Sequence, residues 1–283
     1  MPLVYRQLAQ PNAEPVSLTQ ALAHLRVDFT QDNAYIQGLI TAARQYIERE
    51  TNRAIFNRPM ILTLDYFPWP GWGSTNGSSA YDGYMESYYR GLAIRLPMPS
   101  TYSVESISYI PTNASEPVTI APVNYSVDLI SEPARITPAP GYTWPYQQNY
   151  IPGQVQILYT AGSYEVPATP AQITVPATAP YTVTPSDTLP VVTITGVTDA
   201  NGNPAVYTNN AGTLTFAATE AGATLNLAYT TSNCPWTLTA AILLLVGHLY
   251  EHRSQNSEVA LKSLPFGIAD LIAGETIDSF RWQ

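Results

Sequence analysis

Cysteine is almost absent from the chain, because Cys234 is the only one among 283 residues. A single cysteine excludes an internal disulfide framework and any zinc site built from cysteine ligands. Lysine is equally scarce: Lys262 is the only one, and 12 Lys and Arg residues face 21 Asp and Glu, for a formal net charge of −9. Such an acidic chain is a poor ligand for DNA phosphates, although it could surround DNA without adhering to it.

Charged residues of either sign are also few, at 12% of the chain against about 25% in average soluble domains. The longest apolar stretch, 240–250, is interrupted by Gly247 and His248 and falls short of the roughly 20 residues that span a bilayer. The first residues lack a basic region followed by an apolar one, so we expect no secretory signal and no membrane association. With 45% apolar residues, the chain can still bury the core of one or two domains.

The N-terminal part predicts two helices. Residues 17–20 (Ser-Leu-Thr-Gln) form a capping-box pattern that begins a short helix, with Val16 placed to pack against the first turn. Thr30 or Asp32 can cap a second helix that continues to about Thr51.

The second of these helices has a clear apolar face. Its members recur at helical spacing: Ile36, Leu39, Ile40, Ala43 and Ile47. The remaining positions include Arg44, Glu48 and Arg49, and we expect these charged side chains to lie on a solvated face.

The middle of the chain alternates apolar and polar residues with period two, the pattern of half-buried strands. Strands are predicted at 60–66, 92–96, 104–110, 125–128 and 155–159. Between the first two lie residues 68–90, which are rich in Gly, Ser, Tyr and Trp. We expect an exposed loop there, carrying Trp69 and Trp72.

Residues 165–233 change in character, since they are rich in Thr, Ala, Val and Pro and contain no basic residue. Short strands are predicted at 191–197, 205–208, 213–217 and 223–229. Turn signals such as Asn201-Gly202 separate them at the spacing of a small sandwich. This segment therefore favours a separate β-sandwich-like domain.

After this segment the chain returns to helix. Pro235 stands near the start of a helix that we expect to end near 253–256, followed by a short helix at 268–273. The apolar face of the longer helix consists of Leu238, Ala241, Ile242, Leu245 and Leu249. The predicted fold class is α+β: a helical core of two N-terminal helices and a long C-terminal helix, a β region, and an additional small all-β domain.

One motif resembles a metal site. His248 and His252 lie four residues apart in an H-x-x-E-H pattern on the predicted C-terminal helix, so both can face the same side. A catalytic zinc site needs a third protein ligand, and the residues that follow offer no second strong helix to present one. We interpret the pair as polar residues near a helix end, where histidine suits the helix dipole.

Two loop motifs also resemble ligand sites. Residues 71–77 resemble a dinucleotide fingerprint with one residue too many, but no clear strand precedes them and no helix follows. Residues 199–203 place oxygen ligands at alternate positions like a calcium loop, but the glycine and the final glutamate of such a loop are missing. A hairpin turn explains them better. No catalytic constellation emerges, and we expect no enzyme activity, no metal and no cofactor.

Six segments, taken in order, resemble those of one protein family. They are residues 16–55, 96–110, 124–138, 155–162, 238–254 and 264–272. Their order is two helices, a β region, a long helix ending in the aromatic-Glu-x-Arg sequence of 250–253, and a tail. In this combination the chain resembles the head–tail connector, or adaptor, proteins of tailed bacteriophages.

The resemblance implies a structural virion protein at the head–tail interface. Such adaptors assemble as a ring, typically of about twelve subunits, beneath the portal ring. They extend the DNA channel and provide the platform for stopper or tail (nozzle) proteins. The implied partners are further copies of the chain, the portal protein and a stopper or tail protein, while DNA passes through without specific binding.

The resemblance also implies a portal-docking segment at the C-terminus. The candidates that it transfers are Leu264, Pro265, Phe266, Gly267, Phe280 and Trp282. Ordinary packing of this tail against its own domain is an equal alternative for the same residues.

Residues 165–233 depart from the family pattern. Connectors usually pass from the strand that matches 155–162 almost directly into the long helix. We therefore interpret 165–233 as an inserted domain, and residues 1–164 together with 234–283 as the adaptor core. The loop at 68–90 has no counterpart in the pattern either.

Two other functions are compatible with the residues. The Thr-, Tyr- and Trp-rich middle would suit a carbohydrate- or receptor-binding virion module, in which Trp69 and Trp72 contact the glycan. A zinc hydrolase would use His248 and His252. We expect the adaptor role, because it accounts for the ordered resemblance at both ends of the chain.

Overall fold

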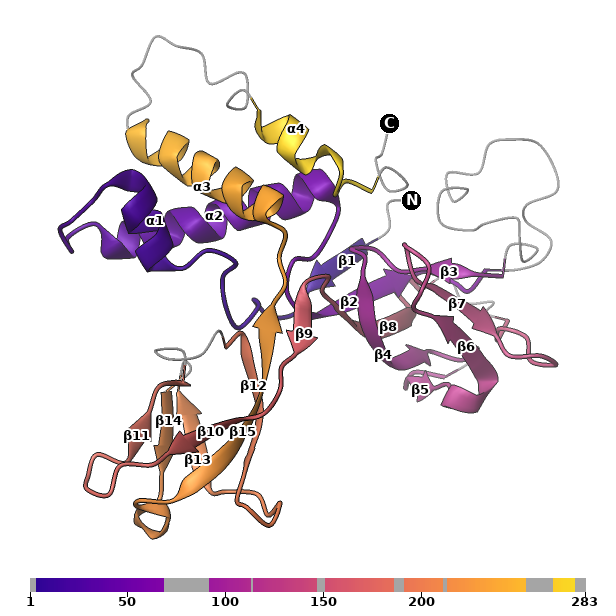
Figure 1. The fold of residues 1–283 in the computed structure, drawn as a ribbon. Helices are drawn as coiled ribbons and strands as arrows, with labels where there is room; N and C mark the ends of the chain where they lie inside the picture. The colour runs from indigo at the N-terminus through magenta and orange to yellow at the C-terminus, as the bar shows by residue number, and fades with distance from the viewer. Residues whose placement is uncertain are drawn as a thin grey trace.

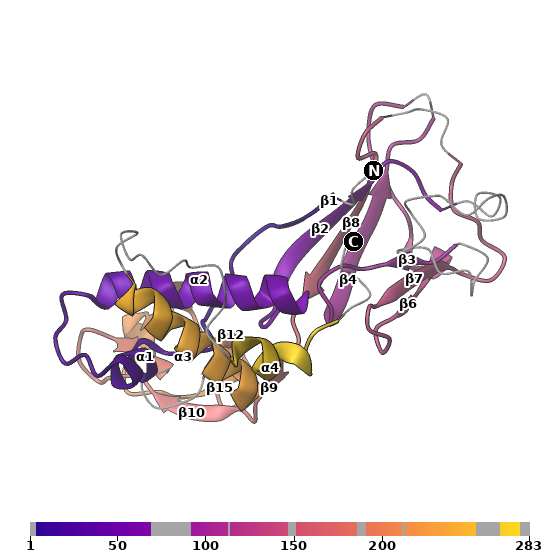
Figure 2. The same ribbon diagram turned by 90° about the horizontal axis from the view of Figure 1, so that it is seen from above.

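A computed structural model describes residues 4–68, 92–112, 114–146, 151–185, 191–210, 213–252 and 267–277. It contains a helical layer, a β region of two sheets, and a second β unit (Figure 1). Viewed from above, the helices lie at one side and the β region at the other (Figure 2). The coarse α+β class expected from the sequence is confirmed. Within the described ranges, no helix is both long and apolar enough to cross a membrane.

In the part of the chain that the structure describes, the helical layer has four helices. They are α1 (Leu18–Leu25), α2 (Asn33–Thr51), α3 (Trp236–Glu251) and α4 (Ile268–Ala273). The predicted capping box begins α1: the Ser17 hydroxyl accepts from the Gln20 N–H at 3.2 Å, and the Gln20 side chain accepts from the Ser17 N–H at 2.9 Å. These local signals place the helix starts within a residue of their predicted positions.

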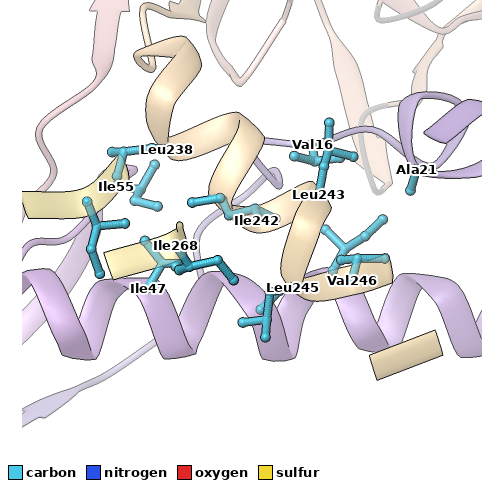
Figure 3. Packing of buried hydrophobic residues seen from close by; sticks show 14 of the residues in the cluster. Val16, Ala21, Ile47, Ile55, Leu238, Ile242, Leu243, Leu245, Val246 and Ile268 are labelled. Atoms are coloured by element: carbon cyan, nitrogen blue, oxygen red, sulfur yellow. The ribbon is translucent and has the colours of Figure 1, made fainter. Parts of the chain in front are cut away.

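The apolar faces of the helices form one core. Ile36, Ile40 and Ile47 of α2 are at most 2% exposed, and they pack with Leu238 and Ile242 of α3. Figure 3 shows several of these side chains between the two helices. Each fully buried aliphatic side chain contributes roughly 1.5–3 kcal/mol, so this core accounts for much of the stability of the layer.

Within the described ranges, the β region contains two antiparallel sheets. The first has the order β1 (Val4–Gln7), β2 (Arg58–Leu64), β8 (Val155–Ala161), β4 (Thr101–Tyr109) and β5 (Val118–Thr119). The second has the order β3 (Ile94–Arg95), β7 (Arg135–Pro138) and β6 (Tyr125–Asp128). The five strands predicted here are confirmed, while most of the loop predicted at 68–90 lies outside the described residues.

The core of the β region is separate from that of the helices. Trp144 is 2% exposed, stacks on Phe67 with ring centroids 5.0 Å apart, and donates its indole N–H to the Leu92 carbonyl at 2.8 Å. Around this pair pack alternating residues of β2 and β8, such as Leu62 and Ile157. A buried indole with a satisfied N–H is a stable arrangement, because no polar atom is left unpaired.

The second β unit also has two sheets. One contains β9 (Glu165–Pro167), β10 (Ala171–Thr174), β12 (Thr193–Thr198) and β15 (Thr224–Ser232). The other has the order β11 (Thr182–Val183), β14 (Thr213–Phe216) and β13 (Tyr207–Asn210). Their buried side chains form a third core. The four strands predicted here are confirmed, whereas β9, β10 and β11 were not predicted, because prolines mask their short apolar pattern.

The second β unit is entered and left at one place. β9 pairs antiparallel with the end of β15, with Thr231 opposite Val166, so the incoming and outgoing strands lie side by side. Glu165 reinforces this pair, since its carboxylate accepts from the Thr230 hydroxyl at 2.5 Å and from the Asn57 N–H at 3.0 Å. A buried carboxylate with two donors fixes the point where the unit leaves the β region.

Candidate interface segments and the polar clusters that hold them

Of the proposed interface residues, only Gly267 lies in the part of the chain that the structure describes. It precedes the first residue of α4 with a φ of 102°, a left-handed conformation that favours glycine. The others lie outside the described residues: Leu264, Pro265, Phe266, Phe280, Trp282, Trp69 and Trp72. Their roles stay predictions.

The segment between the two groups of C-terminal candidates is firmly attached to the helical layer. Ile268 and Ile272 of α4 are 0% and 5% exposed within the helical core. Ile277 is held at the end of α2, where its N–H donates to the Thr51 carbonyl at 3.1 Å and its carbonyl accepts from the Asn52 amide at 3.3 Å. Both ends of the described segment are therefore fixed by the chain's own packing.

Arg53 is the centre of a polar cluster at the same place. Its guanidinium donates to both carboxylate oxygens of Glu132, at 3.1 and 3.0 Å, and to the Glu275 carbonyl at 3.2 Å. It also lies 3.4 Å from the Ser163 hydroxyl oxygen, and Tyr164 donates its hydroxyl to the Glu275 carboxylate. The cluster joins α2, the loop between β6 and β7, the end of β8 and the C-terminal segment.

Two pKa shifts reflect the geometry of this cluster. Burial raises the pKa of Glu132, but hydrogen bonds from Arg53 and Ser100 and the charge of Arg53 lower it more, so the net pKa lies below its ordinary value. Burial, together with the acceptor Glu275, raises the pKa of Tyr164 well above its ordinary value. Glu132 therefore remains charged and Tyr164 remains a donor at neutral pH.

A second polar cluster corrects the sequence analysis. Arg44 and Glu48 were predicted on a solvated face, but they are only 0% and 3% exposed. Arg44 donates to Glu14 at 2.7 Å, and Glu48 accepts from Arg44 at 2.8 Å and from Arg58 at 2.7 Å. The prediction was wrong because residues distant in sequence, on the chain before α1 and on β2, cover this side of α2. Arg49, in contrast, is exposed as expected.

The loop between β6 and β7 presents an apolar tip on a rigid base. Ile130 is 96% exposed, and the N–H groups of Ile130 and Ser131 donate to the Asp128 carboxylate at 3.0 and 3.1 Å. Arg135 donates to the same carboxylate at 2.6 Å. The hydrogen bonds from Ser131 and Arg135 lower the pKa of Asp128 well below its ordinary value of 3.8.

This arrangement makes the hairpin sensitive to acid. A lowered pKa in the folded state stabilises the fold above the ordinary pKa, and this contribution is lost as the pH falls toward the lowered value. We expect Asp128→Asn to lower the thermal unfolding midpoint at pH 7, and the difference from wild type to shrink below pH 3.8. Glu116→Gln, at an exposed carboxylate, is the control for the change in net charge. A difference that is the same at every pH would contradict the role of Asp128.

The two histidines lie together without a third ligand among the described residues. The rings of His248 and His252 are 4.4 Å apart, and the Nδ1 atom of His252 is 2.9 Å from the His248 carbonyl. No group of three or more His, Cys, Asp and Glu side chains that could hold a metal occurs in the described ranges. Cys234 has a pKa raised to about 11, mainly by burial, so its thiol stays protonated at neutral pH.

The residues that resembled a calcium loop form a turn, as predicted. Asp199 accepts from the N–H groups of Asn201 and Asn203, both at 2.8 Å, and Gly202 has a φ of 85°. A hydrogen bond from the Asn203 side-chain amide, at 2.9 Å, and those from the two N–H groups lower the pKa of Asp199 below its ordinary value. The carboxylate thus serves the turn itself.

The fold belongs to the α+β class. The polar clusters around Arg53 and Glu48 hold segments of the chain together. The family model for phage gp6-like head–tail connector proteins matches residues 15–77, which include α1, α2 and β2. This match confirms the resemblance to head–tail connector proteins inferred from the six segments. A comparison with curated proteins gives no match.

Solved structures of gene transfer agent (GTA) particles are also similar. A chain in the neck of an empty GTA particle, computed with C6 symmetry, is 16% identical, with 96% of this chain and 95% of that chain covered and a TM-score of 0.50. A chain in the virion of a native GTA particle is 17% identical, with 96% and 94% covered and a TM-score of 0.49. At this identity the first match shows a shared fold.

Proposed function

We propose that the chain is a structural, non-enzymatic virion protein that acts as a head–tail connector. The observation that carries the proposal is the match of the connector family model to residues 15–77. The fold shared with a chain of a GTA particle neck supports the predicted location at the head–tail interface. In this role the chain forms a ring of about twelve copies beneath the portal, extends the DNA channel and attaches stopper or tail components.

The net charge suits a channel for DNA. Each copy carries a formal charge of −9, so a ring presents a strongly acidic surface. Like charges keep the DNA backbone from adhering to the wall, which allows DNA to slide through.

The C-terminal segment is the proposed portal contact. Residues 264–267, Phe280 and Trp282 flank the segment that the helical core and the end of α2 hold in place. Attachment at Ile277 fixes the point from which the last residues continue. A docking element that starts from a fixed point loses less conformational entropy on binding than a free tail.

Residues 165–233 are proposed as a domain added to the adaptor core of residues 1–164 and 234–283. The separate core and the single entry point at β9 and β15 support this division. Such a unit can be carried on the ring as a decoration or as a contact to the tail.

The single lysine allows a sharp test of the portal contact. Apart from the N-terminal amine, Lys262 is the only amine in the chain, and it stands two residues before the first portal candidate. We expect an amine-reactive cross-linker applied to intact particles to join Lys262 to the portal protein, with the chain present at about twelve copies per particle. Lys262→Arg keeps the charge and should abolish the cross-link without changing the copy number.

Other results would redirect the assignment. Absence of the chain from particles would overturn the connector role. Presence in particles with contacts to fibres through 68–90 or 165–233, and none to the portal, would favour a receptor- or glycan-binding module instead. Loss of glycan binding on replacement of Trp69 or Trp72 would then identify the contact.

A further inference from the structure

The outward face of α3 is unusually apolar for a surface helix. Trp236 is 71% exposed and Leu244 is 40% exposed, with the half-buried Ala240 between them at a spacing of four residues. No charged residue occurs anywhere from Trp236 to Gly247. A helix at the surface of a monomer normally carries charged side chains on its outer face, so this face has the character of a contact surface.

The outward face of α2 is uncharged over most of its length, up to the pair of Arg49 and Glu50 near its end. Its exposed positions Ala34, Gly38, Ala42 and Gln45 carry no charge, and Arg49 follows with a side chain that is 71% exposed. Since the buried faces of α2 and α3 pack against each other (Figure 3), these two outward faces point away from each other. They cannot meet within one molecule.

The net charge of the chain limits which surfaces of two neighbouring copies can contact each other. Molecules with a net charge of −9 repel one another, so copies associate through surfaces that lack acidic residues. We propose that the outward face of α3 in one copy packs against the outward face of α2 in the next copy. This inference rests on the proposed ring, for which it names the contact between subunits.

The directions of the helices suit this contact. Tyr250 near the end of α3 donates to Asp32 at the start of α2 at 2.7 Å, so the two helices run antiparallel. A rotation of about 30° between neighbours in a twelve-membered ring keeps them nearly antiparallel, within the range of common helix crossing angles. When the α3 face of one copy binds the α2 face of the next, the resulting dimer still has one free α2 face and one free α3 face. Further copies can therefore be added until the ring closes.

An antiparallel contact also sets a register. If Trp236 lies against Arg49, Leu244, eight residues further along α3, meets the level of Thr41 and Ala42 on α2, and of these two Ala42 is the exposed one. In one molecule the guanidinium of Arg49 lies 4.9 Å from the centroid of the Tyr46 ring and 3.5 Å from Glu50. In the contact it would also face the indole ring of Trp236, a favourable pairing of a cation with an aromatic face. The exposed Leu244 would fill the space left by a small residue.

The test compares the assembly of the purified full chain with that of two variants by sedimentation velocity and native mass spectrometry. Leu244→Glu places a charge in the contact, and we expect the subunit concentration needed for half-assembly to rise about tenfold or more. Val206→Glu makes the same kind of change at a 71% exposed position of the second β unit, and we expect no change. Matching circular dichroism and unfolding midpoints would show that both variants fold.

A compensating pair tests the register. Ala42→Lys combined with Leu244→Glu should restore assembly to near the wild-type level, because the two new charges would face each other across the contact. An intact ring in Leu244→Glu, or no rescue in the pair, would overturn the inference and leave the connector role in place. A wild-type chain that stays monomeric at every concentration would also overturn it, since a ring assembled only on the portal needs no contact of its own.

Discussion

Replacement of Gly162 by alanine is expected to destabilise the chain by about 3 kcal/mol or more, because the new methyl group has no room. An ideal Cβ at this position would lie 2.6 Å from the Asn57 Cα and closer still to the Asn57 nitrogen and Oδ1. The Gly162 N–H also donates to the Ser100 carbonyl at 2.8 Å, which attaches the backbone at Gly162 to the residue just before β4. Because backbone atoms crowd the site, no side-chain rotation can relieve the clash.

Chemical denaturation of the full chain measures this effect. Gly196→Ala is the matched control, since an ideal Cβ there meets nothing within 4 Å and the change should stay within about 0.5 kcal/mol. A loss of less than 1 kcal/mol for Gly162→Ala would show that the Asn57 backbone can move away. The glycine ends the strand segment that resembles connector proteins, so this close contact gives a physical reason for a glycine in that segment.

Local signals in the sequence predicted most of the elements. The capping box of residues 17–20 and the spacing of Ile36, Ile40 and Ile47 depend only on neighbouring residues, and both were confirmed. The three long strands of the five-stranded sheet, β2, β4 and β8, were predicted for the same reason, since alternation within each strand decides which side chains face the core. Its short outer strands β1 and β5 were not predicted. The strands β9 and β10 were missed because nearby prolines mask their short apolar pattern, and the pairing with β15 that stabilises them is not visible in the sequence.

The polar clusters could not be predicted, because they join residues far apart in the sequence. Arg53 meets Glu132 and Glu275 across separations of 79 and 222 residues. The apolar and polar faces of α2 show which side packs on the helical core, but they do not show that other segments will cover Arg44 and Glu48 on the polar side. The sequence did contain one signal, since an Arg and a Glu four residues apart on one helix can pair. The portal candidates remain predictions, because the structure describes only Gly267 among them.

The buried charges of the second cluster lead to the other large expected effect. Glu48 accepts hydrogen bonds from Arg44, Arg58 and the Ile55 N–H, at 2.8, 2.7 and 3.0 Å. Glu48→Ala removes the acceptor of two buried guanidinium groups: Arg58 loses its ion pair with Glu48, and Arg44 keeps only its ion pair with Glu14. We expect a loss of about 3–5 kcal/mol in the free energy of unfolding. Glu50→Ala, on the same helix with an exposed partner Arg49 at 3.5 Å, should cost no more than about 1 kcal/mol.

Replacement of the whole group separates the cost of an unpaired charge from the value of the ion pairs. In the triple variant Arg44→Met, Glu48→Leu, Arg58→Met, no buried charge remains without a partner, because Glu14 is 29% exposed and can be hydrated. Since a buried ion pair gains little over well-packed apolar residues of similar size, the triple variant should be more stable than Glu48→Ala despite two further changes. A triple variant less stable than Glu48→Ala would show that the ion pairs themselves stabilise the junction of α2 and β2. That result would make the cluster a source of stability, whereas the expected one makes it a device that fixes how the helix meets the sheet.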